Sequence, residues 1–200
     1  MCFGQEDVPD LAFEKARIIY NFGADFLETW GRPVENARRL SESNAFDGKT
    51  KTELVHLSPH VSLTGAKADR WVVINPGSEA MVALSIASVI RDQKGGYDFL
   101  SGMLAAFAPE KVAEATGVPA EKMKELAQKF IDNSPGLAMG GGPSSRNSNL
   151  TSLHVAINIL NAVSGNLGKT VFFHDQPAPE NTSHHNLVQL IEDLEAGKVE

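Results

Sequence analysis

The chain of 200 residues has only one cysteine, Cys2. A single thiol excludes a disulfide within the chain, and it excludes an iron–sulfur cluster held by the chain's own cysteines. The six histidines do not form the pattern of paired histidines at helical spacing beside an acid that metal sites on helices favour. We therefore expect no metal site, and we expect Cys2 to be an ordinary thiol near a frayed end.

Long apolar runs and basic clusters are also missing. No run reaches the roughly 18 apolar residues that span a bilayer, and residues 1–10 lack the basic start and apolar core of a secretory signal. The net charge is −7, whereas nucleic-acid binding needs clustered Lys and Arg. These absences argue against a nucleic-acid partner and against direct membrane insertion, so we expect the chain as given to be soluble.

Two common catalytic signatures are missing as well. The glycine-rich stretch 140–145 fails the Gly-x-Gly-x-x-Gly fingerprint of dinucleotide binding and lacks the lysine of a phosphate-binding P-loop. No Gly-x-Ser-x-Gly nucleophile elbow occurs, so the sequence does not support hydrolase chemistry. A self-standing Rossmann-like nucleotide-binding dehydrogenase is weakened by the missing fingerprint, but it stays open as the alternative function.

What the sequence does contain is a series of short apolar segments that run into polar turns. Short β-branched runs bounded by turn residues are typical of buried parallel strands. We expect such strands at 17–22, 54–57, 71–74 and 137–139. Helical patterns separate them, with Pro33 and Pro109 at helix starts and Ser78 as an N-cap. The expected helices span 34–41, 79–92, 97–106, 109–116, 120–133, 149–164 and 185–196.

Strands that alternate with helices predict an α/β fold with a doubly wound, mainly parallel sheet and helices on both faces, as in Rossmann-like domains. Ligands of such sheets bind beyond the carboxyl ends of the strands. Backbone N–H groups there bind anions, and Asp25 can accept from hydroxyls. The candidate binding residues are Gly23, Ala24, Asp25, Ser58, Ser78, Glu79, Gly140, Gly141 and Gly142. A turn, a helix start or a glycine loop with a purely structural role is the alternative for each.

Five stretches follow one another in a characteristic order between residues 17 and 168. They are Phe-Gly-Ala-Asp-Phe-Leu-Glu-Thr-Trp at 22–30, Ser-Leu-Thr-Gly-Ala-Lys-Ala-Asp-Arg-Trp at 62–71, Pro-Gly-Ser-Glu at 76–79, a helix pair at 109–126, and Leu-Asn-Ala-Val-Ser-Gly-Asn-Leu-Gly at 160–168. In this order they resemble the dinucleotide-binding α/β domain of the molybdopterin oxidoreductases of the dimethyl-sulfoxide-reductase type. Within that group the first stretch is most similar to the molybdopterin-like B subunits of alternative complex III and of menaquinone reductase complexes.

The resemblance implies a domain of a subunit in respiratory, quinone-linked electron transfer. The implied partners are other domains and iron–sulfur subunits of a respiratory complex. The implied parent protein is exported and peripheral to the bacterial cytoplasmic membrane. The cofactor of the family is molybdopterin guanine dinucleotide, which the parent either retains or has lost.

The chain also departs from the family pattern. The family's Asp-Pro-Arg after the second strand appears as Ser58-Pro59-His60, without the acidic hydroxyl acceptor and the arginine. The acidic residue that in the family meets the guanine end appears as Glu79, one methylene longer. No molybdenum ligand precedes the domain. The chain is therefore an oxidoreductase domain only by family and is expected to be inactive alone: it binds part of the guanine dinucleotide, or it is a cofactor-free scaffold.

The sequence also predicts how the chain is divided. We expect a lead-in at 1–15, the dinucleotide-binding-like domain at 16–175, and a segment at 176–200 that carries a helix. That last helix and its glycine, Gly197, stand where a new strand would normally follow. This pattern indicates that 176–200 begins the next domain of a longer parent.

Overall fold

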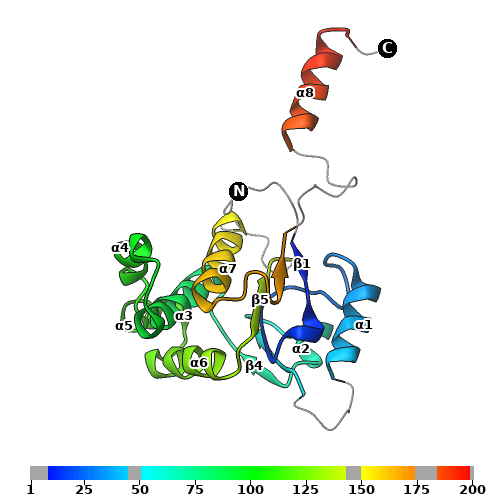
Figure 1. Cartoon of the computed structure of the whole chain (residues 1–200). Helices are drawn as coiled ribbons and strands as arrows, with labels where there is room; N and C mark the ends of the chain where they lie inside the picture. The colour runs from blue at the N-terminus through cyan, green and yellow to red at the C-terminus, as the bar shows by residue number, and fades with distance from the viewer. Residues whose placement is uncertain (1–8, 45–50, 143–149, 174–183, 199–200) are drawn as a thin grey trace.

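The computed structural model describes residues 9–44, 51–142, 150–173 and 184–198 (Figure 1). Cys2, the turn expected at Asp47-Gly48, and the continuation of the glycine loop from Pro143 lie outside the described residues. The side chains of His184 and His185 are also outside the description.

The centre of the fold is a parallel sheet of four strands. In chain order they are β2 (Ile18–Phe22), β3 (Glu53–Leu57), β4 (Arg70–Val72) and β5 (Gly136–Gly140). In space they lie in the order β4-β3-β2-β5, and all three neighbouring pairs are parallel. The predicted α/β fold with a mainly parallel sheet is confirmed.

The strand register brings the predicted turns to one edge of the sheet. Asn21 lies beside His56, and Phe22 lies beside Gly140. The chain passes from β2 outward through β3 to β4 and then returns to β5 on the other side of β2. The topological switch point, where ligands of doubly wound sheets bind, therefore lies between the carboxyl ends of β2 and β5.

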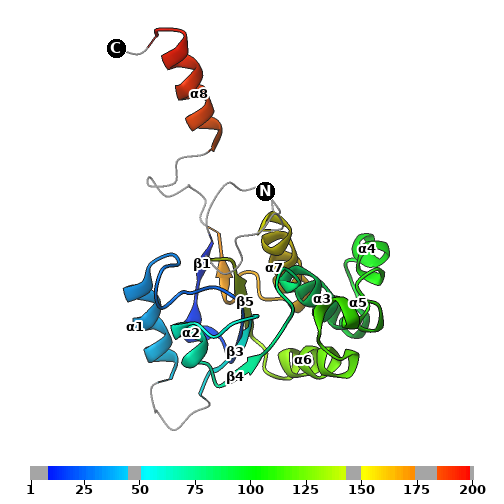
Figure 2. The same ribbon diagram turned by 180° about the vertical axis from the view of Figure 1, so that it is seen from behind.

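Helices cover both faces of the sheet, as predicted (Figures 1 and 2). One face carries α3 (Glu79–Lys94), α5 (Pro109–Thr116), α6 (Ala120–Asp132) and α7 (Leu150–Ser164). The other face carries η1 (Phe13–Lys15), α1 (Pro33–Ser43) and the short α2 (Leu63–Ala66). Two apolar cores follow from this arrangement, a large one that includes Ile86 and Leu126, and a smaller one that includes Phe26 and Leu40. All residues of β2 and of β5 are buried, which explains the nearly continuous apolar sequence of these two strands.

Several helix boundaries follow directly from the sequence. Pro109 occupies the first turn of α5, and Gly117 ends the helix in the left-handed conformation at φ 71°. In α6 the apolar residues recur at helical spacing, and Met123, Leu126 and Phe130 are buried against the sheet. The helix expected at 97–106 is divided into η2 (Asp98–Leu100) and α4 (Ser101–Ala105).

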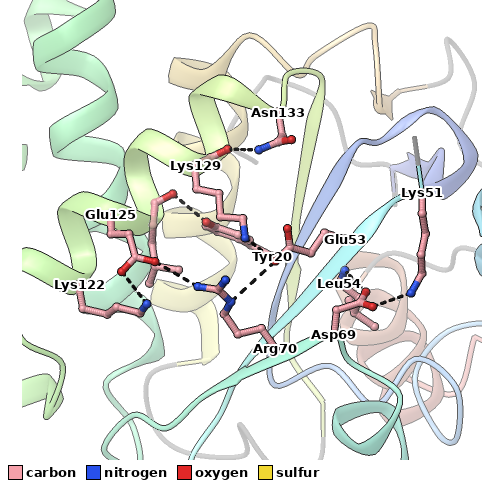
Figure 3. Close-up of polar contacts among 11 residues, drawn as sticks. Tyr20, Lys51, Glu53, Leu54, Asp69, Arg70, Lys122, Glu125, Lys129 and Asn133 are labelled. Atoms are coloured by element: carbon pink, nitrogen blue, oxygen red, sulfur yellow. Dashed lines mark hydrogen bonds and ion pairs between the residues drawn. The ribbon is translucent and has the colours of Figure 1, made fainter. Parts of the chain in front are cut away.

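Tyr20 joins the sheet to α6. Its hydroxyl donates to the carbonyl oxygen of Leu126 at 2.7 Å, and its ring packs against Phe130 with 4.6 Å between the ring centroids (Figure 3). Burial, followed by the charge of Glu53, raises the pKa of the Tyr20 phenol. The tyrosine therefore stays neutral and acts as a buried hydrogen-bond donor.

A second, two-stranded sheet was not predicted. β1 (Asp10–Leu11) pairs antiparallel with β6 (Val171–Phe172), and Asp10 lies beside Phe172. Strands of two residues, such as β1 and β6, are too short to show an alternating pattern in the sequence. This pairing ties the expected lead-in to the end of the main domain.

Side chains rather than another strand cover the outer edge of β5. Asn161 of α7 accepts from the Ala138 N–H at 3.0 Å and donates to the Ala138 carbonyl at 2.8 Å. Asn166 donates to Asn161 Oδ1 at 3.1 Å, and Thr170 donates to the Gly136 carbonyl at 2.6 Å. The two asparagines of the stretch at 160–168 therefore have a structural role, since they satisfy the backbone of an edge strand.

The last described helix, α8 (His184–Glu195), is close to the predicted one. Its apolar side chains are exposed: Leu187, Val188, Leu190, Ile191 and Leu194.

Candidate functional site

The turn after β2 is held by a buried asparagine. Asn21 Oδ1 accepts from the Ala24 N–H at 2.8 Å, and Asn21 Nδ2 donates to the Ala24 carbonyl at 2.8 Å. Gly23 takes a positive φ of 74°, which few other residues adopt. The turn is therefore fixed in place by the strand that precedes it.

Asp25 follows this turn, and its carboxylate is nearly buried. Asp25 has an exposed fraction of 7%, and its Oδ1 has no hydrogen-bond partner among the residues that the structure describes. Leaving a buried acceptor unpaired costs about 1–3 kcal/mol, so most such atoms in native proteins have a partner. Among the predicted site residues, Asp25 therefore carries the unpaired acceptor that a ligand could satisfy.

His56 lies beside Asn21 on the neighbouring strand and is completely buried. Its Nδ1 is 3.0 Å from Asn21 Nδ2, whereas its Nε2 is buried without a partner. Burial lowers the pKa of His56, while the charge of Asp25 and the backbone of His60 oppose this effect. The imidazole is therefore neutral at neutral pH and lies within the electrostatic influence of Asp25.

The glycine loop after β5 meets the β2 turn, as expected for a shared site. A Cβ on Gly142 would lie 3.2 Å from the carbonyl oxygen of Gly23. The other two glycines are explained by α7, because a Cβ would lie 2.6 Å from Ile157 Cδ1 at Gly140 and 2.7 Å from His154 Cε1 at Gly141. The space that the missing side chains leave is therefore filled by protein, and 140–142 do not form an open phosphate cradle.

Ser58 directly follows β3, and its hydroxyl and carbonyl oxygens accept hydrogen bonds from the protein itself. It is fully buried, and its hydroxyl accepts from the His60 N–H at 3.4 Å. Its carbonyl accepts from the Trp71 indole N–H at 3.0 Å. Ser58 therefore reaches the predicted edge, but it does not replace the acidic hydroxyl acceptor of the family pattern.

Ser78 and Glu79 lie at the start of α3, which follows the edge strand β4. Both are buried. Ser78 is the N-cap residue of α3, as expected, but its hydroxyl donates back to the Asn75 carbonyl at 2.6 Å and makes no capping hydrogen bond to the helix. Ser78 has φ −95° and ψ 2°, not the extended backbone typical of an N-cap, so the hydroxyl is turned toward the preceding turn. Ser78 and Glu79 follow β4, and β3 lies between β4 and β2. The two residues are therefore separated from the β2 turn by one strand.

A surface hollow of about 490 Å³ lies beside the first turns of α1 and includes no predicted residue. Arg32, just before α1, and Arg38, within it, line the hollow. Each forms an ion pair with a glutamate of α1, at 3.4 Å to Glu35 and 2.9 Å to Glu42. These pairings compensate the positive charge, so the hollow does not attract anions strongly.

No group of three or more His, Cys, Asp or Glu side chains is placed to hold a metal ion within the part of the chain that the structure describes. Across residues 9–44, 51–142, 150–173 and 184–198, no helix has both the length and the apolar character needed to cross a bilayer.

Similarity to known proteins gives this geometry its context. Over 120 residues the chain is 32% identical to the molybdopterin-binding-like subunit of the menaquinone reductase of Nitratidesulfovibrio vulgaris. Over 187 residues it is 25% identical to the dimethyl sulfoxide reductase of Haemophilus influenzae. The chain is related to molybdopterin oxidoreductases. The resemblance of the sequence motifs to the dimethyl-sulfoxide-reductase type is thereby confirmed.

These similarities cover more than half of this chain but only a small part of each relative. The two matches include 58% and 78% of this chain, but only 17% and 23% of the relatives. The acetylene hydratase of Pelobacter acetylenicus shares the fold, with a TM-score of 0.66 and 20% identity over 84% of this chain and 24% of that protein. No protein-family model matches the chain. The chain therefore spans less than a quarter of these relatives.

The residues fit the molybdopterin-type cofactor in one place and not in another. The unpaired Asp25 Oδ1, after β2, and His56 Nε2, on β3, fit a polar ligand beyond the carboxyl ends of these two neighbouring strands. The closely packed glycines and the internally bonded Ser58 do not fit a phosphate cradle or a second hydroxyl acceptor. The described residues therefore offer unpaired polar atoms to a ligand at this edge, but no open phosphate cradle.

Sequence reasoning found Asp25 but missed two residues that surround it. Asn21 and His56 were not predicted because each lies within an apolar strand, and the histidines were tested only for the spacing of metal ligands. One signal was available, since a histidine and an asparagine in strands that are otherwise apolar predict a buried polar pair.

Proposed function

We propose that this chain is the dinucleotide-binding-type domain of a molybdopterin-oxidoreductase-like subunit that serves respiratory, quinone-linked electron transfer. The menaquinone reductase relative supports the link to a quinone. Because the chain has one cysteine, it does not ligate an iron–sulfur cluster with its own thiols. Its role in the parent is to bind part of the cofactor and to position it next to other domains and iron–sulfur subunits of the complex.

The ligand of the domain is part of a guanine dinucleotide. The observation that carries this proposal is the buried, unpaired Oδ1 of Asp25 at the switch point of the sheet. Asp25 accepts a hydrogen bond from the ligand, and the turn at Gly23 and Ala24 supports its backbone. When a molybdopterin cofactor is bound in the parent, the cofactor supplies the redox chemistry, and the residues of this chain hold one end of it.

A cofactor-free scaffold is the second candidate. Its support is the glycine loop, where Ile157 and His154 occupy the space beside Gly140 and Gly141. In that case the domain provides surfaces for partner subunits, and Asp25 and His56 are remnants of a binding site. A self-standing Rossmann-like dehydrogenase is the third candidate, and it predicts NAD binding instead of guanine nucleotide binding.

Isothermal titration calorimetry of the purified chain with guanosine diphosphate and with NAD separates the three. We expect heat with the guanine nucleotide and none with NAD. Asp25→Asn should weaken guanine binding about ten- to a hundredfold, because hydrogen bonds to a charged group are worth about 1.5–3 kcal/mol. Asp98→Asn, an exposed aspartate on η2, is the matched control and should bind like the original chain. Silence with both nucleotides supports the scaffold, and heat with NAD alone supports the dehydrogenase.

A further inference from the structure

The hydrogen bonds of Asn21 determine which ring nitrogen of His56 carries the proton. The Ala24 N–H can only donate and the Ala24 carbonyl can only accept, so they fix Asn21 Oδ1 on the first and Nδ2 on the second. The second hydrogen of Nδ2 then points to His56 Nδ1, 3.0 Å away. Nδ1 must therefore accept, and a neutral imidazole that accepts at Nδ1 carries its proton on Nε2.

The His56 ring is also held from its other side. A Cβ on Gly65 of α2 would lie 2.8 Å from His56 Cδ2 and 3.0 Å from Nε2, so the ring packs directly against the glycine backbone. Asn21 and Gly65 together keep the ring from turning. The Nε2–H is thus a fully buried donor of fixed direction. The His60 backbone is near enough to act on the ring, but no described group meets the geometry of a hydrogen bond to Nε2.

An unpaired acceptor accompanies this unpaired donor. Asp25 Oδ1 is buried without a partner, and Asp25 lies close enough for its charge to act on the imidazole. The two residues are also linked through Asn21, which bonds to His56 and to the residue that precedes Asp25. A buried donor and a buried acceptor of this kind are complementary to a group that can both accept and donate, and a hydroxyl is the smallest such group.

We infer that Asp25 and His56 bind one hydroxyl-type oxygen, which accepts from His56 Nε2–H and donates to Asp25 Oδ1. This inference deepens the proposed function and rests on it where the oxygen belongs to the ribose of a guanine nucleotide. An ordered water is the other source of the same chemistry, because buried waters satisfy such groups in many proteins. Only with the ribose is His56 a ligand-contacting residue; with the water it binds the solvent molecule that fills the site.

The first test distinguishes the ribose from the water. Calorimetry compares guanosine monophosphate with its 2′-deoxy and 3′-deoxy counterparts on the full chain. A ribose hydroxyl bound by both residues predicts that one deoxy compound binds about tenfold more weakly than guanosine monophosphate. Equal affinity of all three compounds excludes the ribose and leaves the water as the source.

Two variants of His56 show whether the imidazole is the donor. His56→Asn keeps an acceptor near the position of Nδ1 and removes the Nε2 donor, whereas His56→Gln places an amide N–H near Nε2. The ratio between the affinities for guanosine monophosphate and for the weaker deoxy compound, the ribose preference, should fall to about 1 in His56→Asn. Part of it should persist in His56→Gln. Asp25→Asn should also lose the preference. An unchanged preference in His56→Asn would overturn the ribose assignment.

Nitrogen NMR of the unsubstituted chain keeps the inference testable if no guanine nucleotide binds, which would refute the proposed function alone. We then expect the His56 proton on Nε2, exchanging slowly, with a nuclear Overhauser effect to a bound water that Asp25→Asn weakens. A proton on Nδ1, or an Nε2 proton without contact to water or ligand, would refute the inference. This measurement does not depend on the folding of any His56 variant.

Discussion

The two edges of the sheet handle charge in opposite ways. At the amino-terminal edge, Glu53 and Arg70 are the first residues of β3 and β4. Lys129 of α6 binds Glu53 at 2.6 Å, and Arg70 binds Glu125 at 3.1 Å (Figure 3). At the carboxyl-terminal edge, Asp25 Oδ1 and His56 Nε2 are buried without partners.

Asp69 shows what a paired aspartate does at the amino-terminal edge. Its Oδ2 accepts from the Leu54 N–H at 2.9 Å, and its Oδ1 forms an ion pair with Lys51 at 2.6 Å (Figure 3). The comparison with Asp25 indicates that the charged groups of one edge are paired within the fold, while the other edge leaves buried polar atoms unpaired among the described residues.

The largest expected effect concerns the glycine loop at the carboxyl-terminal edge. Gly140→Ala should lower the free energy of unfolding by about 3 kcal/mol, because the new Cβ would lie 2.8 Å from the Phe22 carbonyl oxygen, which belongs to the backbone. Gly102→Ala in α4 is the matched control, since nothing lies within 4 Å of its Cβ position. The control should raise stability by about 0.5–1 kcal/mol.

Urea unfolding followed by circular dichroism measures both glycine variants. If Gly140→Ala were as stable as Gly102→Ala, the loop would have free space beside β5. That result would restore an open ligand cradle at this edge and remove the main support for the scaffold.

The same substitution at the two aspartates should have opposite effects. Asp69→Asn should lower the free energy of unfolding by about 1 kcal/mol, a modest loss because the Asp69 side chain is 33% exposed. Asp25→Asn should raise it by about 1 kcal/mol, because it removes a charge from a nearly buried position. Chemical denaturation of the two variants at neutral pH checks the signs, and a loss of equal size at both positions would show the edges to be alike.

Much of the fold was predictable because its signals are local. The limits of α5 follow from Pro109 and Gly117, and the buried face of α6 follows from the spacing of its apolar residues. The sequence did not predict the pair of β1 and β6 or the four-residue helix α2, because such short elements carry no periodic pattern. Their formation depends on contacts with residues far away in the sequence.

The site was predictable only in part for the same reason. Asp25 could be found because it follows a strand directly. The role of His56 depends on its register with Asn21, 35 residues earlier, and the packing of Gly141 depends on His154 of a later helix. Sequence patterns within one strand or one loop do not contain these relationships.

The pH dependence of stability should reveal the buried imidazole. Burial holds the pKa of His56 below its ordinary value of 6.5, so the unfolded chain takes up the proton first as the pH falls. The contribution of neutral His56 to stability is therefore complete above pH 6.5 and is lost as the pH falls below it, by at most about 1.4 kcal/mol per pH unit. The unfolding free energy of His56→Gln, measured in urea from neutral to mildly acidic pH, should decline less steeply than that of the original chain. If the two curves of unfolding free energy against pH were parallel, His56 would be solvated and not buried.

The smallest effect is the acid counterpart at the amino-terminal edge. Burial alone would raise the pKa of Asp69, but the Leu54 N–H and Lys51 lower it below its ordinary value of 3.8. Its contribution to stability is thus present above pH 3.8 and is lost as the pH falls through the lower pKa of the folded state. The difference in unfolding free energy between the original chain and Asp69→Asn should be constant near neutral pH and should shrink, by less than about 1 kcal/mol, in stronger acid. A difference that persists unchanged to about pH 2 would show that the Asp69 carboxylate acts through its shape and not its charge, and the contrast between the two edges would then no longer rest on ion pairing.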